Sequence, residues 1–148
     1  MKIIAQRVSS SKVIVNDSAI SELGYGILLY VGFSQADTQF EADFLAEKIL
    51  NLRIFDDDND KMNLSIIDVG GQINIISQFT LYADTNKGRR PSFSNAMEPG
   101  KAEVLYQYFI NIIKQSDLIV GEGLFGKYMQ IESINEGPAT FILEKYNT

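Results

Sequence analysis

The stretch from Ile73 to Phe93, INIISQFTLYADTNKGRRPSF, decides how the rest of this chain is interpreted. It begins with an apolar, β-branched run that is too short for a helix and is typical of a buried strand. The run ends at Ser77-Gln78-Phe79-Thr80, so three polar side chains follow a core strand, and a basic loop comes next. Such side chains either cap their own strand or form a site for an anionic ligand, and both interpretations stay open.

Length and composition favour one domain that spans residues 1–148 and buries a proper core. The chain is 45% hydrophobic and has nine phenylalanines and seven tyrosines. Its net charge of −6 argues against a general nucleic-acid coat protein. It does not exclude a nucleic acid that binds locally at one basic loop. No apolar run approaches the roughly 20 residues of a membrane span, and the first residues lack signal-peptide features, so we expect a cytoplasmic protein.

The chain contains no histidine and no cysteine. This absence removes the Ser-His and Cys-His nucleophile pairs and the usual zinc ligand sets. Any hydrolysis must use carboxylates, hydroxyls, lysine, backbone N–H groups or a group on the substrate. We expect no metal site and no cofactor.

Hydrophobic periodicity predicts two main helices among several strands, which is typical of an α/β fold. Residues 38–51 carry apolar side chains at helical spacing, with Thr38 and Glu41 placed to form a capping box. Residues 102–115 repeat the helical pattern. Strands are predicted over residues 2–9, around Val13 and Val15, over 27–32, 53–55 and 73–76, between 119 and 135, and over 139–144. The three serines at residues 9–11 predict a turn between the first two strands.

Two motifs of this chain match well-known templates only in part. The acidic run from Asp56 to Lys61 lacks the glycine and the glutamate of a calcium-binding loop, which favours a solvated turn. The run from Gly121 to Lys127 fits GxGxxG and the start of a phosphate-binding loop. However, Tyr128 replaces the Ser or Thr that binds magnesium, and no convincing helix follows, so a glycine-rich bend is the better interpretation.

The run Asn135-Glu136-Gly137-Pro138-Ala139-Thr140 predicts a Gly-Pro turn between two strands. The peptide bond into Pro138 can be cis at little cost, and a rigid Gly-Pro could hold two carbonyl groups fixed as a steric gate. An ordinary turn is the alternative.

Two of these runs together resemble the D-aminoacyl-tRNA deacylases, also called D-tyrosyl-tRNA deacylases. Residues 77–80 are similar to the SQxT motif of that family, and residues 135–140 to its NxGPxT motif, which carries a Gly-cisPro. Further matches lie in order along the chain: Gln6-Arg7-Val8, Arg53-Ile54-Phe55, Lys61-Met62-Asn63 and Arg90-Pro91-Ser92-Phe93.

The resemblance implies a hydrolase that cleaves the ester between a D-amino acid and tRNA, also cleaves glycine mischarged onto alanine tRNA, and ignores L-aminoacyl-tRNA. It implies a mixed sheet curled towards a barrel with helices outside, and a cytoplasmic homodimer with active sites at the interface. An aminoacyl ester is already activated, so the site must chiefly position water and stabilise an oxyanion. We assign that role to backbone N–H groups at Phe79 and Thr80, together with Gln78.

The Thr80 hydroxyl is an obvious candidate nucleophile, but no base is evident beside it, and we favour assistance by the 2′-OH of the terminal adenosine. By resemblance, Gly137-Pro138 from the neighbouring subunit excludes L side chains from the pocket. Arg7 would hold this turn in place through hydrogen bonds to the backbone of the turn. The alternative is that Arg7 is an exposed charge on an edge strand.

The remaining predicted contacts are less specific. We expect Ser77, Ala102, Phe125 and Met129 to line the substrate pocket, although the last three are equally plausible as plain core. Lys87, Arg89 and Arg90 are predicted to contact tRNA phosphates, with a solvated loop as the alternative. The competing functions are a tRNA-binding module without turnover, a hydrolase of other D-amino acid esters, and a structural or ligand-binding dimer.

Overall fold

One long strand organises the sheet of this protein, whose computed structural model describes residues 1–146. Strand β1 (Lys2–Val15) runs through the middle of the sheet. The turn predicted at residues 9–11 is wrong, because the strand continues through it. Ser11 is buried there, and its Oγ accepts a hydrogen bond from Asn74 Nδ2 at 3.2 Å. A polar run can therefore stay in a strand when a partner inside the sheet satisfies it.

The sheet is mixed and is nearly closed into a barrel. Its order is β2-β1-β3-β6-β7, with β8 on the other edge of β1. Strand β1 is antiparallel to β2, β3 and β8, whereas β3, β6 and β7 run parallel. The bounds of these strands are Ser18–Leu23 (β2), Gly26–Gly32 (β3), Gln72–Ser77 (β6), Val120–Glu122 (β7) and Gln130–Glu144 (β8).

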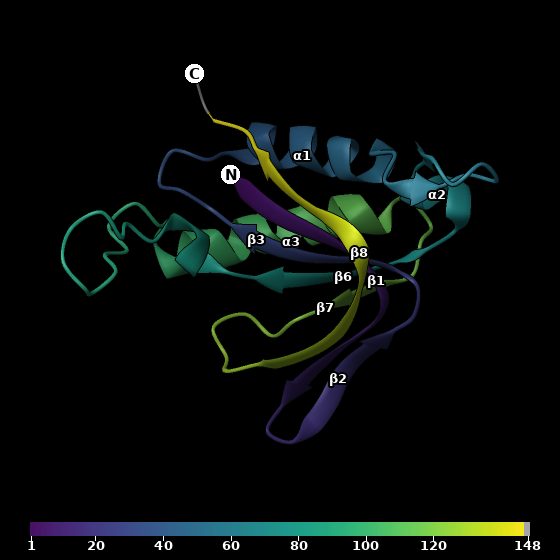
Figure 1. The fold of residues 1–148 in the computed structure, drawn as a ribbon. Coiled ribbons are helices and arrows are strands. Elements are labelled where there is room, and N and C mark those ends of the chain that lie inside the picture. The colour runs from purple at the N-terminus through teal and green to yellow at the C-terminus, as the bar shows by residue number, and fades with distance from the viewer. Residues whose placement is uncertain (147–148) are drawn as a thin grey trace.

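The two long helices are α1 (Gln39–Asn51) and α3 (Pro99–Lys114), and they pack side by side against the sheet (Figure 1). The predicted capping box of α1 is confirmed, since Thr38 and Glu41 bond each other's backbone N–H groups. Helix α3 begins three residues earlier than expected, at Pro99, because proline is favoured in the first turn. The α/β class, the curled mixed sheet and the two outer helices are thus as predicted.

Short elements complete the fold. A two-stranded hairpin and a one-turn helix lie between α1 and β6, and a short 3₁₀ helix follows β6. Within residues 1–146, no group of acidic side chains could hold a metal ion, and no helix is long and apolar enough to cross a membrane. These elements are β4 (Phe55–Asp56), β5 (Met62–Leu64), α2 (Ile66–Val69) and the 3₁₀ helix η1 (Phe79–Tyr82).

Two hydrophobic cores lie on the two faces of the sheet. The larger core fills the space between the sheet and the helices, and it includes Ile75 of β6 and Tyr106 of α3. The smaller core lies inside the curl of the sheet and is formed by Val8, Val13, Leu28 and Ile76. Strand β6 contributes to both cores through alternate side chains, which is why its sequence is almost continuously apolar.

Candidate active site

A pocket opens where the parallel strands β3 and β6 end. Val31 of β3 faces Ser77 of β6 in this register, so both strands end at one edge of the sheet. The carboxyl ends of parallel strands are a common place for ligand sites, because the chain must leave the sheet there. The polar end of the Ile73–Phe93 stretch therefore lies at the edge where a ligand is expected.

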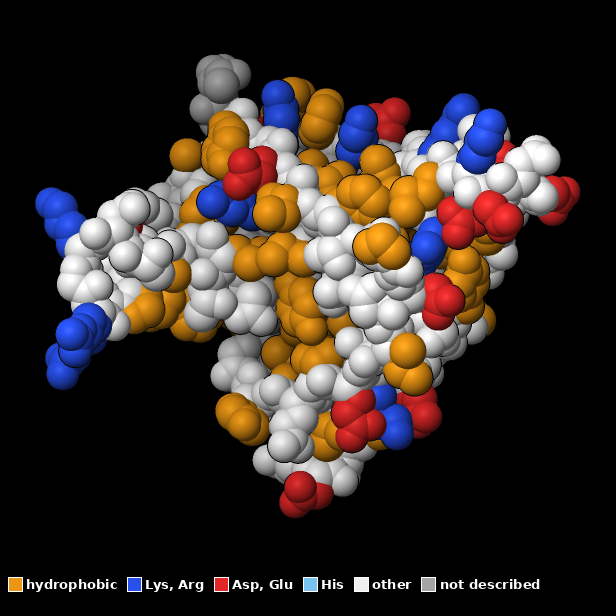
Figure 2. Space-filling view, viewed as in Figure 1, with side chains coloured by type: hydrophobic (Ala, Val, Ile, Leu, Met, Phe, Trp, Pro, Cys, Tyr) orange, Lys and Arg blue, Asp and Glu red, His pale blue; other side chains and the backbone are white. Residues whose placement is uncertain are grey.

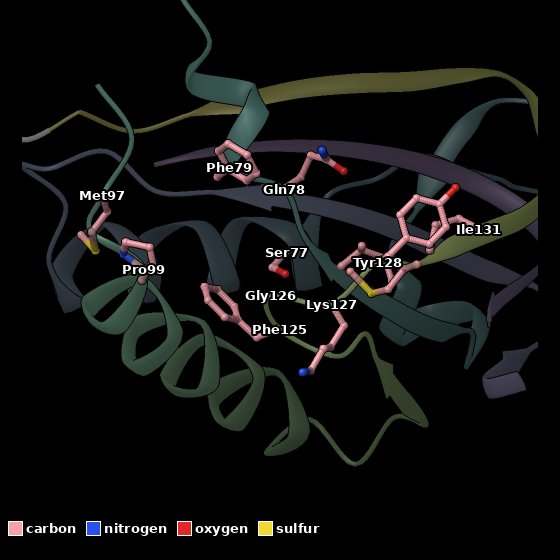
Figure 3. Close-up of a pocket in the computed structure, with 13 residues that line it drawn as sticks. Ser77, Gln78, Phe79, Met97, Pro99, Phe125, Gly126, Lys127, Tyr128 and Ile131 are labelled. Carbon is pink, nitrogen blue, oxygen red and sulfur yellow. The ribbon is translucent and has the colours of Figure 1, made fainter. Parts of the chain in front are cut away.

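The pocket has a volume of about 590 Å³ and joins the two cores of the protein. In Figure 3, Met97 and Pro99 lie at one end, Tyr128 and Ile131 at the other, and Ser77 points into the middle. The lining contains no Asp or Glu, and Lys127 is its one charged residue. The full lining is Ile76, Ser77, Gln78, Phe79, Met97, Pro99, Ala102, Phe125, Gly126, Lys127, Tyr128, Met129 and Ile131.

The polar wall of the pocket is made where β6 passes into η1. Gln78 precedes η1, and its backbone N–H donates a hydrogen bond to the Val31 carbonyl at 2.7 Å. No side chain caps η1. The N–H groups of Phe79 and Thr80 begin the helix, and first-turn amides have no acceptor within a helix. This turn therefore presents two backbone donors beside the pocket.

The Thr80 hydroxyl lies against an amide. Gln78 Nε2 donates to Thr80 Oγ1 at 2.5 Å. An amide cannot take a proton from the hydroxyl, and no carboxylate or lysine is hydrogen-bonded to Thr80 among the described residues. The geometry orients the threonine without activating it.

The first turn of helix α3 lines one end of the pocket. Glu98 caps α3 by accepting hydrogen bonds from Gly100 N at 2.9 Å and Lys101 N at 3.1 Å. These bonds hold the pKa of Glu98 below its ordinary value. The cap fixes the first turn of α3, and with it Pro99 and Ala102, which face the cavity.

Six of the predicted site residues share this pocket, while others lie elsewhere. Thr80 stands beside the pocket through its hydrogen bond to Gln78. Arg7, Gly137 and Pro138 are absent from the lining of their own chain's pocket. The six lining residues are Ser77, Gln78, Phe79, Ala102, Phe125 and Met129.

The Gly-Pro segment is a bulge within one long strand, rather than a turn between two. Gln6 faces Thr140 and Val8 faces Asn135, so the four residues 136–139 of β8 oppose Arg7 alone. Gly137 and Pro138 are exposed, and the bond between them is cis. The extra residues must leave the plane of the sheet, which makes the segment project.

The base of this bulge is fastened by its own motif. The Thr140 hydroxyl accepts hydrogen bonds from Asn135 Nδ2 at 3.1 Å and from Gln6 Nε2 at 3.3 Å. A Cβ on Gly137 would lie 2.7 Å from Asn135 Oδ1, so a larger residue would disturb this fastening. The residues Asn135, Gly137 and Thr140 of the NxGPxT motif therefore each help to hold the base of the bulge.

Arg7 fills the space beneath the bulge and is buried, so it is no surface charge. Its Nε donates to the Glu136 carbonyl at 2.9 Å, and its Nη1 donates to the Ile54 carbonyl at 2.8 Å. The same Nη1 lies 3.2 Å from Asp56 Oδ2. One guanidinium therefore connects the backbone of the bulge with the β4 segment.

The basic residues of the loop stand apart from the pocket, on an arm formed by residues 83–96 (Figures 1 and 2). Paired backbone hydrogen bonds of 2.8 and 2.9 Å between Asp84 and Ser92 close the arm. Lys87, Arg89 and Arg90 are exposed, and none of them forms an ion pair with a described carboxylate. At the root of the arm, Phe93 meets Phe79 edge to face, with ring centroids 5.0 Å apart.

The sequence did not single out several of the lining residues. Met97 lies between the arm and α3, and Pro99 begins α3. Lys127 ends the glycine-rich bend and Tyr128 follows it. The bend itself was the available signal, because chain reversals next to strand ends often carry binding residues. As predicted, no helix follows this bend; the chain passes into β8.

Comparisons with known proteins agree with this geometry. The family model described as D-Tyr-tRNA(Tyr) deacylase matches residues 4–144. The chain is 47% identical to a D-aminoacyl-tRNA deacylase of Clostridioides difficile, covering 97% of each chain. It is 49% identical to the protein of that name from Thermodesulfovibrio yellowstonii, covering 95% of this chain and 96% of that protein.

Solved structures give the same result for the fold. The structure titled c-Myc DNA Unwinding Element Binding Protein has a TM-score of 0.93 and 38% identity, and covers 99% of this chain and 100% of its own. A probable eukaryotic D-amino acid tRNA deacylase has a TM-score of 0.83 over 96% of this chain and 97% of its own; at 18% identity it supports the fold alone.

The family model and the relatives identify an ester hydrolase, and the structure gives it a single α/β domain. The chain belongs to the D-aminoacyl-tRNA deacylase family, whose members are hydrolases that act on aminoacyl-tRNA ester bonds.

Proposed function

We propose that this protein removes D-amino acids, and glycine mischarged onto alanine tRNA, from tRNA by hydrolysing the ester bond, and leaves L-aminoacyl-tRNA intact. It acts as a cytoplasmic homodimer and needs no cofactor. The observation that carries the proposal is the pair of uncapped backbone amides at Phe79 and Thr80, which begin η1 beside a pocket free of carboxylates.

The amides suit the chemistry of an activated ester. Attack by water places negative charge on the ester oxygen, and two aligned N–H donors stabilise that charge by roughly 3 kcal/mol each. Because no Asp or Glu lines the pocket, no carboxylate there repels the negative charge of the oxyanion. Gln78 orients the Thr80 hydroxyl, and Ser77 offers a further hydroxyl in the middle of the cavity.

The attacking water is activated by the substrate in this mechanism. Because the partner of the Thr80 hydroxyl is an amide, the protein supplies no base there. The 2′-OH of the terminal adenosine lies next to the ester in any aminoacyl-tRNA and can help to transfer the proton. Thr80 then positions the ester, and does not attack it.

Stereospecificity comes from the bulge of a second subunit. Gly137 and Pro138 are exposed and do not reach their own chain's pocket, whereas Arg7 holds them in one position. A rigid projecting backbone can enter a neighbour's pocket and clash with an L side chain, and a clash rejects a mirror image more completely than a weaker attraction does. Glycine has no side chain to exclude and is therefore cleaved.

The arm supplies affinity for the tRNA body. Lys87, Arg89 and Arg90 are exposed and have no carboxylate partner among the described residues, so their charge is available to phosphates.

The activity is tested by a paired time course on D-tyrosyl-tRNA and L-tyrosyl-tRNA, with metal chelated. Release from the D form alone is expected. The Thr80→Ala variant should keep measurable turnover, lowered by about tenfold for a lost positioning contact. Complete loss in a variant that folds and binds tRNA would instead make Thr80 the nucleophile.

The gate is tested by replacing the proline that keeps its backbone rigid. Pro138→Ala should begin to cleave L-tyrosyl-tRNA while its rate on D-tyrosyl-tRNA changes less. Unchanged rejection of the L form in a folded dimer would remove the bulge from the mechanism.

A further inference from the structure

Tyr128 is a large aromatic side chain left in solvent at the rim of the pocket. Its exposed fraction is 84%, the highest among the large hydrophobic residues described. Figure 3 shows its ring beside Ile131, at the end of the pocket away from Pro99. An exposed aromatic ring at the mouth of a ligand site is available for stacking.

The segment that carries Tyr128 is held in place. Gly123 N donates to the Ile75 carbonyl at 2.9 Å, and Lys127 N donates to the Leu124 carbonyl at 3.2 Å. Gly126 has a φ of +71°, a left-handed conformation that glycine adopts without strain. The ring is thus presented by a fastened bend, so that little order would have to be gained on binding.

The charge of this rim differs from the charge of the protein. The chain carries a net charge of −6, yet the pocket lining contains no carboxylate. Lys127, adjacent to Tyr128, is exposed and forms no ion pair with a described residue. Figure 3 shows the Lys127 side chain pointing away from the Tyr128 ring, so the two residues face different parts of a ligand at this rim. Single-stranded nucleic acid is bound by aromatic rings that stack on bases together with basic groups that contact the backbone.

We propose that Tyr128 stacks on the unpaired base that precedes the terminal adenosine of tRNA, while Lys127 contacts the phosphate between these two nucleotides. The inference rests on the proposed function, which places the terminal adenosine and its ester in the pocket. The RNA must leave the pocket across its rim, and the occupant is therefore the single-stranded 3′ end of the same substrate.

The test compares a complete substrate with one that lacks the preceding nucleotide. Hydrolysis of D-tyrosyl-tRNA and of D-tyrosyl-adenosine is measured for the wild type, Tyr128→Ala and Tyr128→Phe. In Tyr128→Ala, the ratio of kcat/KM for tRNA to that for the adenosine ester should fall about tenfold, mainly through KM. Tyr128→Phe keeps the stacking face and should restore the ratio. Phe40→Ala, which removes an exposed ring from α1, is the matched control and should leave the ratio unchanged.

Binding of uncharged tRNA gives a readout that does not depend on catalysis. Tyr128→Ala should weaken it about tenfold, and Lys127→Ala should lower the salt dependence by about one phosphate contact.

An equal loss on both ester substrates would place Tyr128 at the terminal nucleoside instead, and an unchanged ratio with unchanged tRNA binding would remove the base site. A changed molecular mass of Tyr128→Ala in sedimentation would assign the ring to contact between copies of the chain. Failure of the wild type to cleave either ester, with tRNA binding still sensitive to Tyr128, would overturn the proposed function alone.

Discussion

The pocket and the β8 bulge are held in place by different means. The pocket is concave and is assembled from separate segments that meet at the end of β6, with an exposed pair of phenylalanine rings at its edge. The bulge is convex and belongs to one strand, and a buried guanidinium fixes it from below. The difference teaches that the part proposed to reject a substrate depends on one buried side chain, whereas the part proposed to accept it depends on the packing of several segments.

The largest effect should follow from removing the anchor of the bulge. Arg7→Ala leaves the carbonyls of Glu136 and Ile54 without their buried donor, and we expect the free energy of unfolding to fall by about 3 kcal/mol. Urea unfolding measures this change. Lys12→Ala on the same strand is the control, because its ion pairs at 3.7 and 3.8 Å are partly exposed and should contribute less than about 1 kcal/mol. Equal losses in the two variants would mean that the buried guanidinium anchors the bulge no more firmly than an exposed ion pair would.

A smaller effect is expected where the arm meets the pocket. Phe93→Ala removes the ring that packs against Phe79, a contact of about 1 kcal/mol. Since Phe79 begins η1, kcat on D-aminoacyl-tRNA should fall about fivefold. Phe93→Tyr keeps the ring and serves as the control. If Phe93→Ala leaves kcat unchanged, the arm does not help to position the amides.

The Asp56 carboxylate should contribute less to stability than the two backbone carbonyls that Arg7 binds. Asp56 has a side chain that is 45% exposed, so its ion pair with Arg7 is screened by solvent. Asp56→Asn should lower the free energy of unfolding by less than about 1 kcal/mol, as measured in urea at low and high salt. A loss as large as that of Arg7→Ala would mean that the carboxylate, rather than the backbone carbonyls, holds the guanidinium.

The smallest effect concerns the cap of α3 and depends on pH. The backbone N–H groups of Gly100 and Lys101 lower the pKa of Glu98 in the folded protein. The unfolded chain therefore binds a proton more readily, so the stability that the carboxylate adds is complete above its ordinary pKa of 4.5 and is lost as the pH falls through and below that value. Melting temperatures of the wild type and Glu98→Gln should differ at pH 7, and the difference should shrink as the pH falls below 4.5. A constant difference across this range would mean that the charge of Glu98 does not contribute.

Local sequence patterns predicted the elements where local rules are strong. The capping box at Thr38 and Glu41 and the apolar run of β6 follow from side-chain type and spacing alone. Residues 9–11 were misassigned because three successive serines favour a turn, whereas Asn74 from a distant strand satisfies Ser11 in the folded protein. The Gly-Pro segment was also assigned to a turn, because glycine and proline are typical turn residues. In the folded protein the segment lies opposite Arg7 as a bulge, and β8 continues through it.

The polar wall of the proposed site could be predicted from the sequence. A strand followed at once by Ser77, Gln78 and Thr80 must place polar groups at the end of that strand. Tyr128 and Lys127 could not be found in this way, since their exposure and their position at the rim depend on how the glycine-rich bend packs against β6.

The sequence by itself determined the α/β class, the exclusion of histidine and cysteine chemistry, and the two motifs, because these depend on residue type and short spacing. Only the tertiary structure decided that Arg7 lies beneath the bulge, and that the bulge lies outside its own pocket. These relations join residues 129 positions apart, such as Arg7 and Glu136, and they exist only once β1 and β8 have paired.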